Sequence, residues 1–399
     1  MTIFRRPGVA LATTALLLTA ACGLGQSGGE SGGAGEDNAP IKIGTLLSVT
    51  GPAANLGDKM RKGAELAIDE VNAAGGIGGR TIEWTFYDPA GDTSTAVSQT
   101  RRLLDNDGVE LVVGGGSQSG IALAMDPLTS AAGKLFIATE GARQIVQPAE
   151  SHPLTFKTTF NDTAMVERTI EFWKARGITR VAFLPDTTSF GQSAAEEMQR
   201  LAPAAGISVE VAPFDPGTND LTPQISRLAA NNPQAYLAWT TAPSGVTFLR
   251  NVRAVVPDPA VLVQHGFGFV DDRFFTQAGE AGVGTILTSP KLPVYDLLPD
   301  SDPQKAPMAA FADAYRARYG GEQPNVYAGQ AYDAVKVAAA AIEKAGGTDG
   351  AQLAEAIETL GEHVGVTGVF RYSAEDHSGL AADNAVMIQW DGTRFVPVT

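Results

Sequence analysis

The sequence predicts an α/β fold of two doubly wound parallel-sheet lobes with a ligand cleft between them. Short apolar runs alternate with longer runs of helical periodicity from residue 41 onward, which is the pattern of a parallel sheet covered by helices. The same alternation restarts after Thr158. A chain of 399 residues, 44% of them hydrophobic, is also long enough for two hydrophobic cores.

Each predicted strand of the first half leads into a predicted helix. The helix at 58–73 repeats apolar residues at helical spacing, and the glycines of 75–79 end it and turn the chain into the next strand. The strands expected here are 41–47, 81–87, 110–113 and 134–138, and the helices are 58–73, 94–104 and one that starts near Gly120.

The second half repeats this order and then departs from it. Its expected strands are 180–184, 207–211, 235–239 and 260–264, and its helices are 162–176, 192–202, 221–230 and 244–254. A Pro-rich stretch at 290–307 breaks the pattern before helices at 309–319, 326–344 and 352–359 and strands at 368–372, 386–390 and 394–398. Asp391-Gly392 predicts a hairpin between the last two strands.

Ligands of open α/β sheets bind beyond the carboxyl ends of the strands, and between two such lobes that region becomes a cleft. The loops that follow the predicted strands are therefore the expected site. They are 48–57, 114–120, 138–143, 185–191, 239–244 and 265–271.

The loop after the third strand carries the most specific local signal. Three glycines at 114–116 let the backbone approach a ligand closely, and Ser117 and Ser119 bring hydroxyls beside the free N–H groups of the helix that starts near Gly120. A carboxylate or another acceptor is favoured at such a place. An ordinary Gly-rich turn with serines as helix caps would have the same local sequence.

Composition excludes several classes of function. A net charge of -15 without a Lys/Arg cluster predicts no nucleic-acid partner. The single cysteine, Cys22, excludes a disulfide framework or a Cys-based metal site within one chain. The histidines lack metal-ligand spacing, so we expect neither a metal nor a cofactor; they are His152, His265, His363 and His377.

An enzyme is not expected either. The run 116–120 reads Gly-Ser-Gln-Ser-Gly, with glutamine where a G-x-S-x-G nucleophile elbow has serine. The glycines of 75–79 lack the Lys-Ser/Thr of a phosphate-binding P-loop. No arrangement of nucleophile, base and orienting group is evident.

The N-terminus has the layout of an export signal. Arg5 and Arg6 precede an apolar run at 9–20, and Ala20-Ala21-Cys22 follows. This resembles a bacterial lipoprotein signal peptide at 1–22, and the resemblance implies that Cys22 takes the lipid and becomes the mature N-terminus. The Gly/Ser-rich segment 23–40 is predicted to be a flexible tether. The alternative is a cysteine buried in a hydrophobic helix.

Several stretches together resemble the branched-chain amino-acid (Leu/Ile/Val) binding family, the periplasmic substrate-binding proteins of ABC importers with the type I periplasmic-binding fold. Each stretch is weak alone, and the set in this order is specific. The stretches are Ile43-Gly44, Thr50-Gly51-Pro52, Gly63-Ala64-Glu65-Leu66-Ala67, Asn72 to Gly79, Tyr87-Asp88, Gly91-Asp92, Val112 to Ala124, Phe190-Gly191, Tyr327-Ala328, Tyr332-Asp333-Ala334 and Gly368-Val369-Phe370-Arg371-Tyr372.

The resemblance implies two lobes that hinge shut over a small-molecule ligand and present it to an ABC permease. It implies three crossings between the lobes, near Lys157, Thr288 and His363, hence an N-terminal lobe of 41–157 plus 288–363 and a C-terminal lobe of 158–287 plus 364–399. With a lipid on Cys22, the protein is expected as a monomer at the extracytoplasmic face of the cell membrane.

Only some of the family's ligand-binding residues have a match in this sequence. Ser119 matches the family's hydroxyl that grips the substrate carboxylate, whereas Ala142 stands where the family has another hydroxyl, with Thr139 as a substitute. The acid that meets the substrate ammonium would fall near Gly266, where no acid stands. A buried ammonium without its partner costs about 2 to 5 kcal/mol, which disfavours a plain leucine or valine binder unless Glu140 or another acid replaces it.

The other candidate ligand contacts are mostly apolar or aromatic, although core packing is an alternative for each aromatic. They are Leu56, Gln118, Phe190, Trp239, Thr241, His265, Phe267, Phe269 and Tyr327. A carboxylate grip beside aromatic walls suits a branched-chain or aromatic organic acid, an amino acid or an amide.

The rival function is a sensor with the same lobes. A repressor would need a basic helix-turn-helix before the first lobe, where this sequence has a lipoprotein-like signal instead. A lipid-anchored ligand-sensing subunit that reports to a separate signalling partner remains open.

Overall fold

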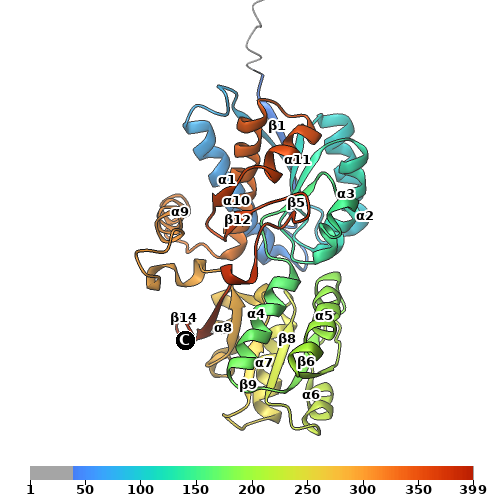
Figure 1. The fold of residues 1–399 in the computed structure, drawn as a ribbon, viewed down its shortest axis with the longest axis vertical. Helices are drawn as coiled ribbons and strands as arrows, with labels where there is room; N and C mark the ends of the chain where they lie inside the picture. The colour runs from blue at the N-terminus through green and yellow to red at the C-terminus, as the bar shows by residue number, and fades with distance from the viewer. Residues whose placement is uncertain (1–38, 399) are drawn as a thin grey trace, which may run out of the picture. The chain divides into compact units, whose positions relative to one another are not determined.

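The computed structural model describes residues 39–398. These residues form two lobes, each built on its own sheet (Figure 1). Cys22, the signal and nearly all of the tether lie outside the described residues. Within 39–398, no helix combines the length and the apolar character needed to cross a membrane.

The first sheet is parallel throughout, with strand order β2-β1-β3-β4-β5. Its strands are β1 (Ile41–Leu46), β2 (Ile82–Tyr87), β3 (Leu111–Gly115), β4 (Leu135–Ala138) and β5 (Thr155–Lys157). Its connecting helices are α1 (Ala54–Ala73), α2 (Thr93–Arg102) and α3 (Ser119–Ala131). Strands β3 and β4 are buried at every residue, as their apolar sequence predicts.

The second sheet has strand order β14-β13-β10-β9-β8-β6-β7. Its strands are β6 (Arg180–Pro185), β7 (Ser208–Val211), β8 (Ala235–Trp239), β9 (Leu262–His265), β10 (Ile286–Ser289), β13 (Val386–Trp390) and β14 (Phe395–Pro397). The helices among them are α4 (Asp162–Ala175), α5 (Ser189–Leu201), α6 (Thr222–Ala229), α7 (Ser244–Val255) and α8 (Asp272–Ala278). The hairpin at Asp391-Gly392 is confirmed, and β13 pairs antiparallel with both β10 and β14, so this sheet is mixed at one edge.

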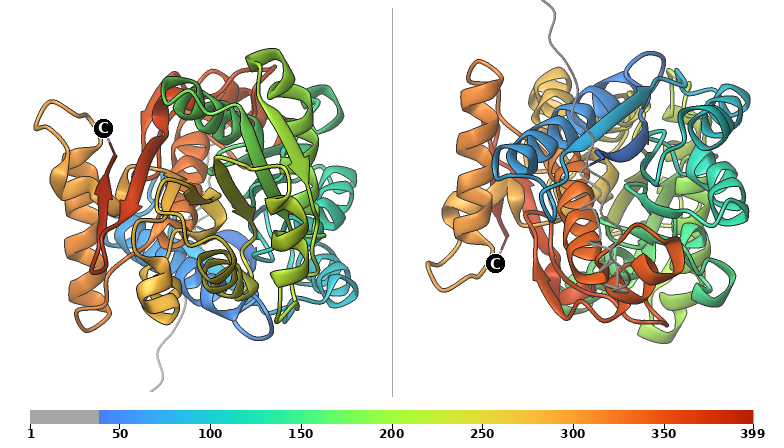
Figure 2. Two further views of the ribbon diagram at one scale, coloured as in Figure 1. Left: turned by 90° about the horizontal axis from the view of Figure 1, so that it is seen from below. Right: turned by 90° about the horizontal axis from the view of Figure 1, so that it is seen from above.

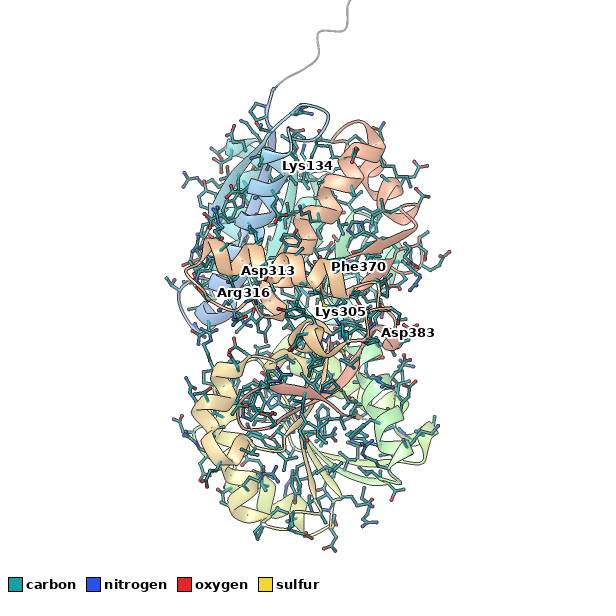
Figure 3. The ribbon with its side chains drawn as sticks, turned by 90° about the vertical axis from the view of Figure 1, so that its left-hand side faces the viewer. Lys134, Lys305, Asp313, Arg316, Phe370 and Asp383 are labelled. Atoms are coloured by element: carbon teal, nitrogen blue, oxygen red, sulfur yellow. The ribbon has the colours of Figure 1, made fainter. Side chains whose placement is uncertain are left out.

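Between β10 and β13 of the second sheet, the chain adds three α-helices and a two-stranded ribbon. They are α9 (Lys305–Arg318), α10 (Val326–Ala345), α11 (Gly350–Glu358) and the ribbon of β11 (Glu362–Val364) and β12 (Val369–Arg371). Helices α10 and α11 contact strands of the first sheet. Helices α1 and α10 pack side by side (Figure 2). Gly63 permits this packing, because a Cβ there would lie 2.0 Å from the backbone oxygen of Ala328. Figure 3 turns α9 toward the reader, with Lys305, Asp313 and Arg316 labelled.

The structure corrects several predicted elements. Helix α1 begins at Ala54 instead of residue 58, since the buried Leu56 and Gly57 belong to its first turns. Strands β5, β10 and β11 and helix α8 were not predicted; they have three to seven residues and too little periodicity to be distinguished from loops.

The limits of the two lobes stay a proposal. Strand β10 pairs within the second sheet up to Ser289, and the chain re-enters that sheet with β13 at Val386. The ribbon of β11 and β12 pairs with neither large sheet.

Candidate functional site

A cavity of about 460 Å³ lies beyond the carboxyl ends of the parallel strands. All six loops that follow the predicted strands contribute to it, together with residues of α10. Its lining residues are Pro52, Ala53, Leu56, Met60, Gly91, Ser117, Gln118, Ser119, Gly120, Thr139, Glu140, Gly141, Thr159, Asp186, Thr187, Thr188, Ser189, Phe190, Gln192, Pro216, Thr241, Ala242, Phe267, Gly268, Tyr327 and Gln330. A ligand here would contact elements attached to both sheets.

The glycine-rich loop after β3 presents two hydroxyl groups to this cavity. Gly116 and Ser117 have φ values of +72° and +63°, a left-handed turn that brings the chain from the strand to α3. The Ser117 Oγ accepts a hydrogen bond from the Ser48 N–H (3.2 Å), and the Ser119 Oγ accepts one from the Ala142 N–H (3.2 Å). No residue of 39–398 accepts a hydrogen bond from either hydroxyl, so both O–H groups are free to donate to a ligand.

Glu140 lies behind these hydroxyls and is almost completely buried. Its Oε1 accepts from the Gly115 and Ser117 N–H groups (3.1 and 3.0 Å) and from the Thr139 Oγ1 (2.9 Å), and its Oε2 accepts from the Thr139 N–H (2.8 Å). Burial raises the pKa of Glu140, and these hydrogen bonds oppose that rise. The Thr139 hydroxyl is therefore already engaged, which weakens its predicted role as a substitute ligand hydroxyl.

Asp186 is a second carboxyl group at the cavity and was not predicted. Its side chain accepts hydrogen bonds from the Thr188 N–H (3.0 Å) and from the hydroxyls of Thr188 and Thr240. Burial raises its pKa. The sequence did offer one signal for Asp186, because it is an acid directly after a strand in a loop predicted to border the cleft. Its hydrogen-bond partner Thr240 could not be foreseen, since it lies 54 residues further along the chain. The described cavity lining contains no lysine or arginine.

The opposite wall is aromatic. Phe190 and Phe267 meet edge to face with ring centroids 5.4 Å apart, and Trp239 packs behind them at 5.9 and 5.6 Å. Tyr327, from α10, donates a hydrogen bond from its hydroxyl to the backbone oxygen of Gly268 (2.6 Å), which ties α10 to the loop after β9. This wall suits the apolar part of a ligand.

Four predicted contact residues do not line the cavity. Trp239 has no exposed surface and forms the second layer behind Phe190 and Phe267. His265 packs against α7 and stacks on Phe269, of the turn after β9, with ring centroids 4.0 Å apart, and burial lowers its pKa to about 3. Ala142 contributes its backbone N–H to Ser119 instead of a side chain to the cavity. Phe269 is likewise in the core.

The remaining predicted residues do line the cavity, and their binding of a ligand stays a prediction. They are Leu56, Ser117, Gln118, Ser119, Thr139, Glu140, Phe190, Thr241, Phe267 and Tyr327. Sequence reasoning missed Gln330 and Thr159, which are joined by a hydrogen bond from Gln330 Nε2 to Thr159 Oγ1 (2.7 Å). The buried Gln330 Oε1 has no partner within the described residues.

The two walls also contact each other beside the cavity. On one side, Arg143, after β4, forms ion pairs with Glu196 (2.9 Å) and Glu197 (3.0 Å) of α5, and its N–H donates to the Ser193 Oγ (3.2 Å). The structure is therefore closed on this side by contacts between the loop after β4 and helix α5.

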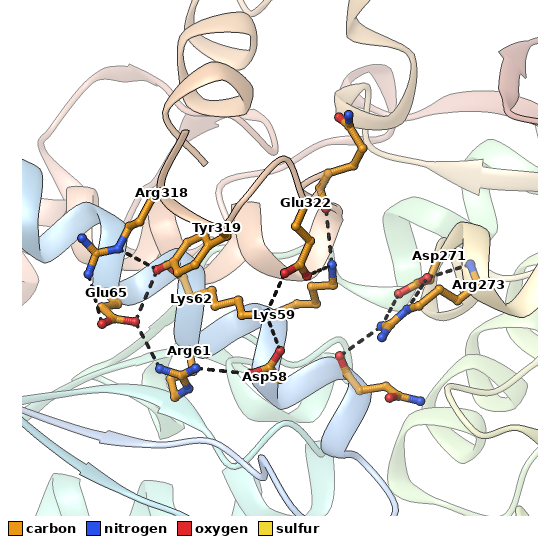
Figure 4. Close-up of polar contacts among 12 residues, drawn as sticks. Asp58, Lys59, Arg61, Lys62, Glu65, Asp271, Arg273, Arg318, Tyr319 and Glu322 are labelled. Carbon is orange, nitrogen blue, oxygen red and sulfur yellow. Dashed lines mark hydrogen bonds and ion pairs between the residues drawn. The ribbon is translucent and has the colours of Figure 1, made fainter. Parts of the chain in front are cut away.

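Another group of contacts lies at the start of α1 (Figure 4). Arg273 of α8 donates to the backbone oxygen of Asn55 (3.3 Å) and pairs with Asp271 (2.8 Å), and Asp271 accepts from Asn325 (2.9 Å). Burial raises the pKa of Asp271, but the hydrogen bonds from Arg273 outweigh it, and the pKa is lowered overall. On the α1 side, Glu322 pairs with Lys62 at 2.8 Å.

The chain is similar in sequence to known proteins over most of its length. The profile of the periplasmic binding protein family matches residues 40–394. A leucine-, isoleucine-, valine-, threonine- and alanine-binding protein of Pseudomonas aeruginosa is 31% identical over 320 residues, which cover 79% of this chain and 82% of the relative.

Solved structures share the fold. The substrate-binding protein of a branched-chain amino acid transporter from Streptococcus pneumoniae, in complex with isoleucine, has a TM-score of 0.76 at 25% identity and covers 89% of this chain and 97% of its own. A solute-binding protein of an ABC transporter from Rhodopseudomonas palustris, in complex with benzoate, has a TM-score of 0.76 at 21% identity and covers 90% of this chain and 95% of its own.

Proposed function

Because the chain belongs to the periplasmic binding protein family, we propose that it is the extracytoplasmic substrate-binding subunit of an ABC importer and that it delivers a small carboxylic acid to a membrane permease. The family consists of extracytoplasmic substrate-binding proteins and not of enzymes. The family membership and fold predicted from the sequence are thereby confirmed. The ligand, the permease and the lipid anchor on Cys22 belong to the proposal.

The proposed ligand class rests on the hydrogen bonding of two serine hydroxyls, those of Ser117 and Ser119. One lone pair of each oxygen accepts from a backbone N–H, from Ser48 for Ser117 and from Ala142 for Ser119, and neither O–H has an acceptor within the described residues, so each hydroxyl presents a donor. The N–H groups of the first turn of α3 lie beside them. Donors gathered at a helix N-terminus favour an anionic oxygen ligand such as a carboxylate.

The position near Gly266 supports a ligand without an ammonium group. A Cβ at Gly266 would lie 2.5 Å from the Trp239 ring, so an acidic side chain has no room there. The carboxyl groups that do reach the cavity, Glu140 and Asp186, already accept hydrogen bonds from protein donors. Each of their four oxygens already has at least one protein donor, so a buried ammonium would have to share it.

The aromatic wall then selects the rest of the ligand. Phe190, Phe267 and Tyr327 face a cavity of about 460 Å³, which accommodates a branched-chain or aromatic body of modest size. The related fold carries isoleucine in one solved structure and benzoate in another. The fold alone therefore leaves the ligand open, and the residues of this cavity favour the acid without an amine.

The test compares ligands that differ only in the ammonium group. Thermal shift and calorimetric titration would use isocaproate, which is leucine without its ammonium group, together with leucine, benzoate and their primary amides. A ligand at a hundred times its dissociation constant adds about 2.7 kcal/mol of stability, which corresponds to roughly 3 to 4 °C for a folded body of this size. We expect this shift with isocaproate or benzoate.

The Ser119→Ala variant tests whether the Ser119 hydroxyl binds the ligand carboxylate. It should weaken binding of a carboxylate about tenfold or more, while the melting temperature without ligand falls by only about 1 to 4 °C, because the buried Ala142 N–H loses its acceptor. Tight binding of leucine with no response to isocaproate or benzoate would overturn the proposed ligand class. Tight carboxylate binding that survives Ser119→Ala would remove the serine grip from the proposal.

A further inference from the structure

Lys157 is the last residue of β5, where the chain leaves the first sheet, and it has no exposed surface. Its Nζ donates hydrogen bonds to three consecutive backbone oxygens, those of Glu140 (3.3 Å), Gly141 (2.9 Å) and Ala142 (3.2 Å). Formation of a strand does not require a buried lysine whose ammonium group donates to three carbonyl oxygens of one loop. Its position instead fixes the loop that follows β4.

The geometry indicates that Lys157 is charged. Only the protonated amine has three N–H donors, and three acceptors converge on it. Burial lowers the pKa of Lys157, and the carboxyl groups of Asp162, Glu140 and Asp376 oppose this. The carboxyl groups thus help to retain a positive charge directly behind the wall of the cavity.

The loop held by Lys157 connects directly to the ligand grip. The Ala142 N–H, in the same loop, donates to the Ser119 Oγ (3.2 Å). The path from the lysine to the serine therefore contains one backbone segment and no other side chain.

The main chain of Lys157 is tied to a distant segment as well. Its N–H donates to the backbone oxygen of His377 (3.0 Å), and its backbone oxygen accepts from the Tyr372 hydroxyl (3.0 Å). These two residues lie between β12 and β13, where the chain passes from the ribbon back to the second sheet. Lys157 thus links the segments that run between the lobes with the loop beside the ligand.

We propose that Lys157 is a positioning residue for ligand binding, which holds the backbone of residues 140–142 so that the Ala142 N–H occupies the acceptor side of Ser119 Oγ and turns the Ser119 O–H toward the ligand carboxylate. This inference rests on the proposed function. Lys157 itself does not line the cavity.

A double-mutant cycle tests the inference, because residues that act through one another give non-additive effects on binding. The variants are Lys157→Met, Ser119→Ala and the combination of both, and the probes for calorimetric titration are isocaproate, benzoate and leucine. Lys157→Met should weaken binding of the carboxylate roughly tenfold when Ser119 is present and less than about twofold when Ser119 is alanine. Lys134→Met, a half-exposed lysine of the same lobe, is the control and should leave affinity unchanged.

Additive effects of the two substitutions would show that Lys157 acts on folding or closure in general. This result would overturn the inference about Lys157 and leave the proposed function standing. So would an unchanged affinity in Lys157→Met. Failure of the wild-type protein to bind any of the three carboxylates would overturn the proposed function and the inference with it. If Lys157→Met does not fold, Lys157→Gln replaces it: its amide has two N–H donors where the ammonium has three, so the loop is held less firmly. A smaller loss of affinity that again disappears when Ser119 is alanine is then expected, and a loss that persists in Ser119→Ala would refute the inference.

Discussion

Gly141 is the point at which a single methyl group should hold the two walls of the cavity apart. The residue follows β4 of the first sheet, and a Cβ on it would lie 2.6 Å from Phe190 Cε2 and 2.8 Å from Phe267 Cζ. Both rings belong to elements of the second sheet. We therefore predict that Gly141→Ala opposes closure of the cleft while leaving each lobe intact.

The size of the effect follows from how little the rings can move. Ordinary van der Waals contact begins at 3.4 Å, so each ring would have to withdraw by most of an ångström. Phe190 and Phe267 are backed by Trp239, which has no exposed surface. Overpacking of this kind costs about 1 to 3 kcal/mol. If only the closed state carries this cost, the affinity for ligand falls by roughly 5- to 150-fold.

The measurement is the dissociation constant of the carboxylate that wild-type protein binds, with small-angle X-ray scattering to follow compaction on addition of ligand. The matched control is Gly120→Ala in the same wall, where a Cβ meets only the Ser189 Oγ, at 3.3 Å. Gly120→Ala should bind within a few-fold of wild type. Wild-type affinity and compaction in Gly141→Ala would refute the argument that the walls meet at this glycine when ligand is bound.

Three further predictions concern stability and location. Gly63→Ala places a methyl group 2.0 Å from the Ala328 backbone oxygen and should lower the free energy of unfolding in urea by about 3 kcal/mol; an unchanged midpoint would contradict the close packing of α1 on α10. The pKa of buried His265 is lowered from 6.5 to about 3, so its stabilising contribution is complete above pH 6.5 and is lost as the pH falls toward 3. Between pH 7 and 4.5, wild type should therefore lose about 2 to 3 kcal/mol more stability than His265→Phe, and equal losses would exclude this residue as the cause. Cys22→Ser should move the protein from the membrane fraction to the soluble fraction, and a variant that stays anchored would rule out the lipid on Cys22.

The order of strands and helices was predictable because burial imposes different periodicities on them. The near-continuous apolar run of β3 and the helical spacing in α1 are both visible in single stretches of sequence. Strand β5 is different: three residues carry no period, and the strand exists because it pairs with β4, 19 residues earlier in the chain. Such elements depend on tertiary pairing, which local sequence does not encode.

The site was predictable as a set of loops and less so as a set of side chains. Trp239 and His265 end their strands in the right place, but neighbouring strand residues point to opposite faces, so an error of one residue in phase moves a side chain from the cavity to the core. The surroundings of Glu140 were not accessible to sequence reasoning at all. Its donors at Gly115 and Ser117 lie 25 and 23 residues away and meet it only through the pairing of β3 with β4.

Glu140 leads to a last prediction, which concerns the charge of the occupied site. A carboxylate held by Ser117 and Ser119 would lie close to Glu140, and the described lining has no lysine or arginine. Lys157, behind the wall, donates to the backbone oxygen of Glu140 and not to its carboxyl group. Within Glu140, Oε1 accepts three hydrogen bonds and Oε2 accepts one, so Oε2 is the oxygen with room for a proton. Burial already raises the pKa of Glu140, and a neighbouring ligand carboxylate would raise it further.

Binding of a carboxylate is therefore expected to take up a proton at Glu140, whose protonated Oε2 then donates to the ligand. By linkage, affinity should rise as the pH falls through the pKa of Glu140 in the complex and should level off below the pKa of Glu140 in the free protein. Calorimetric titrations in buffers of different ionisation enthalpy measure the uptake directly. In Glu140→Gln the uptake should vanish, because the amide does not titrate. Uptake that persists in this variant would assign the proton to another group, with Asp186 as the nearest candidate at the cavity wall.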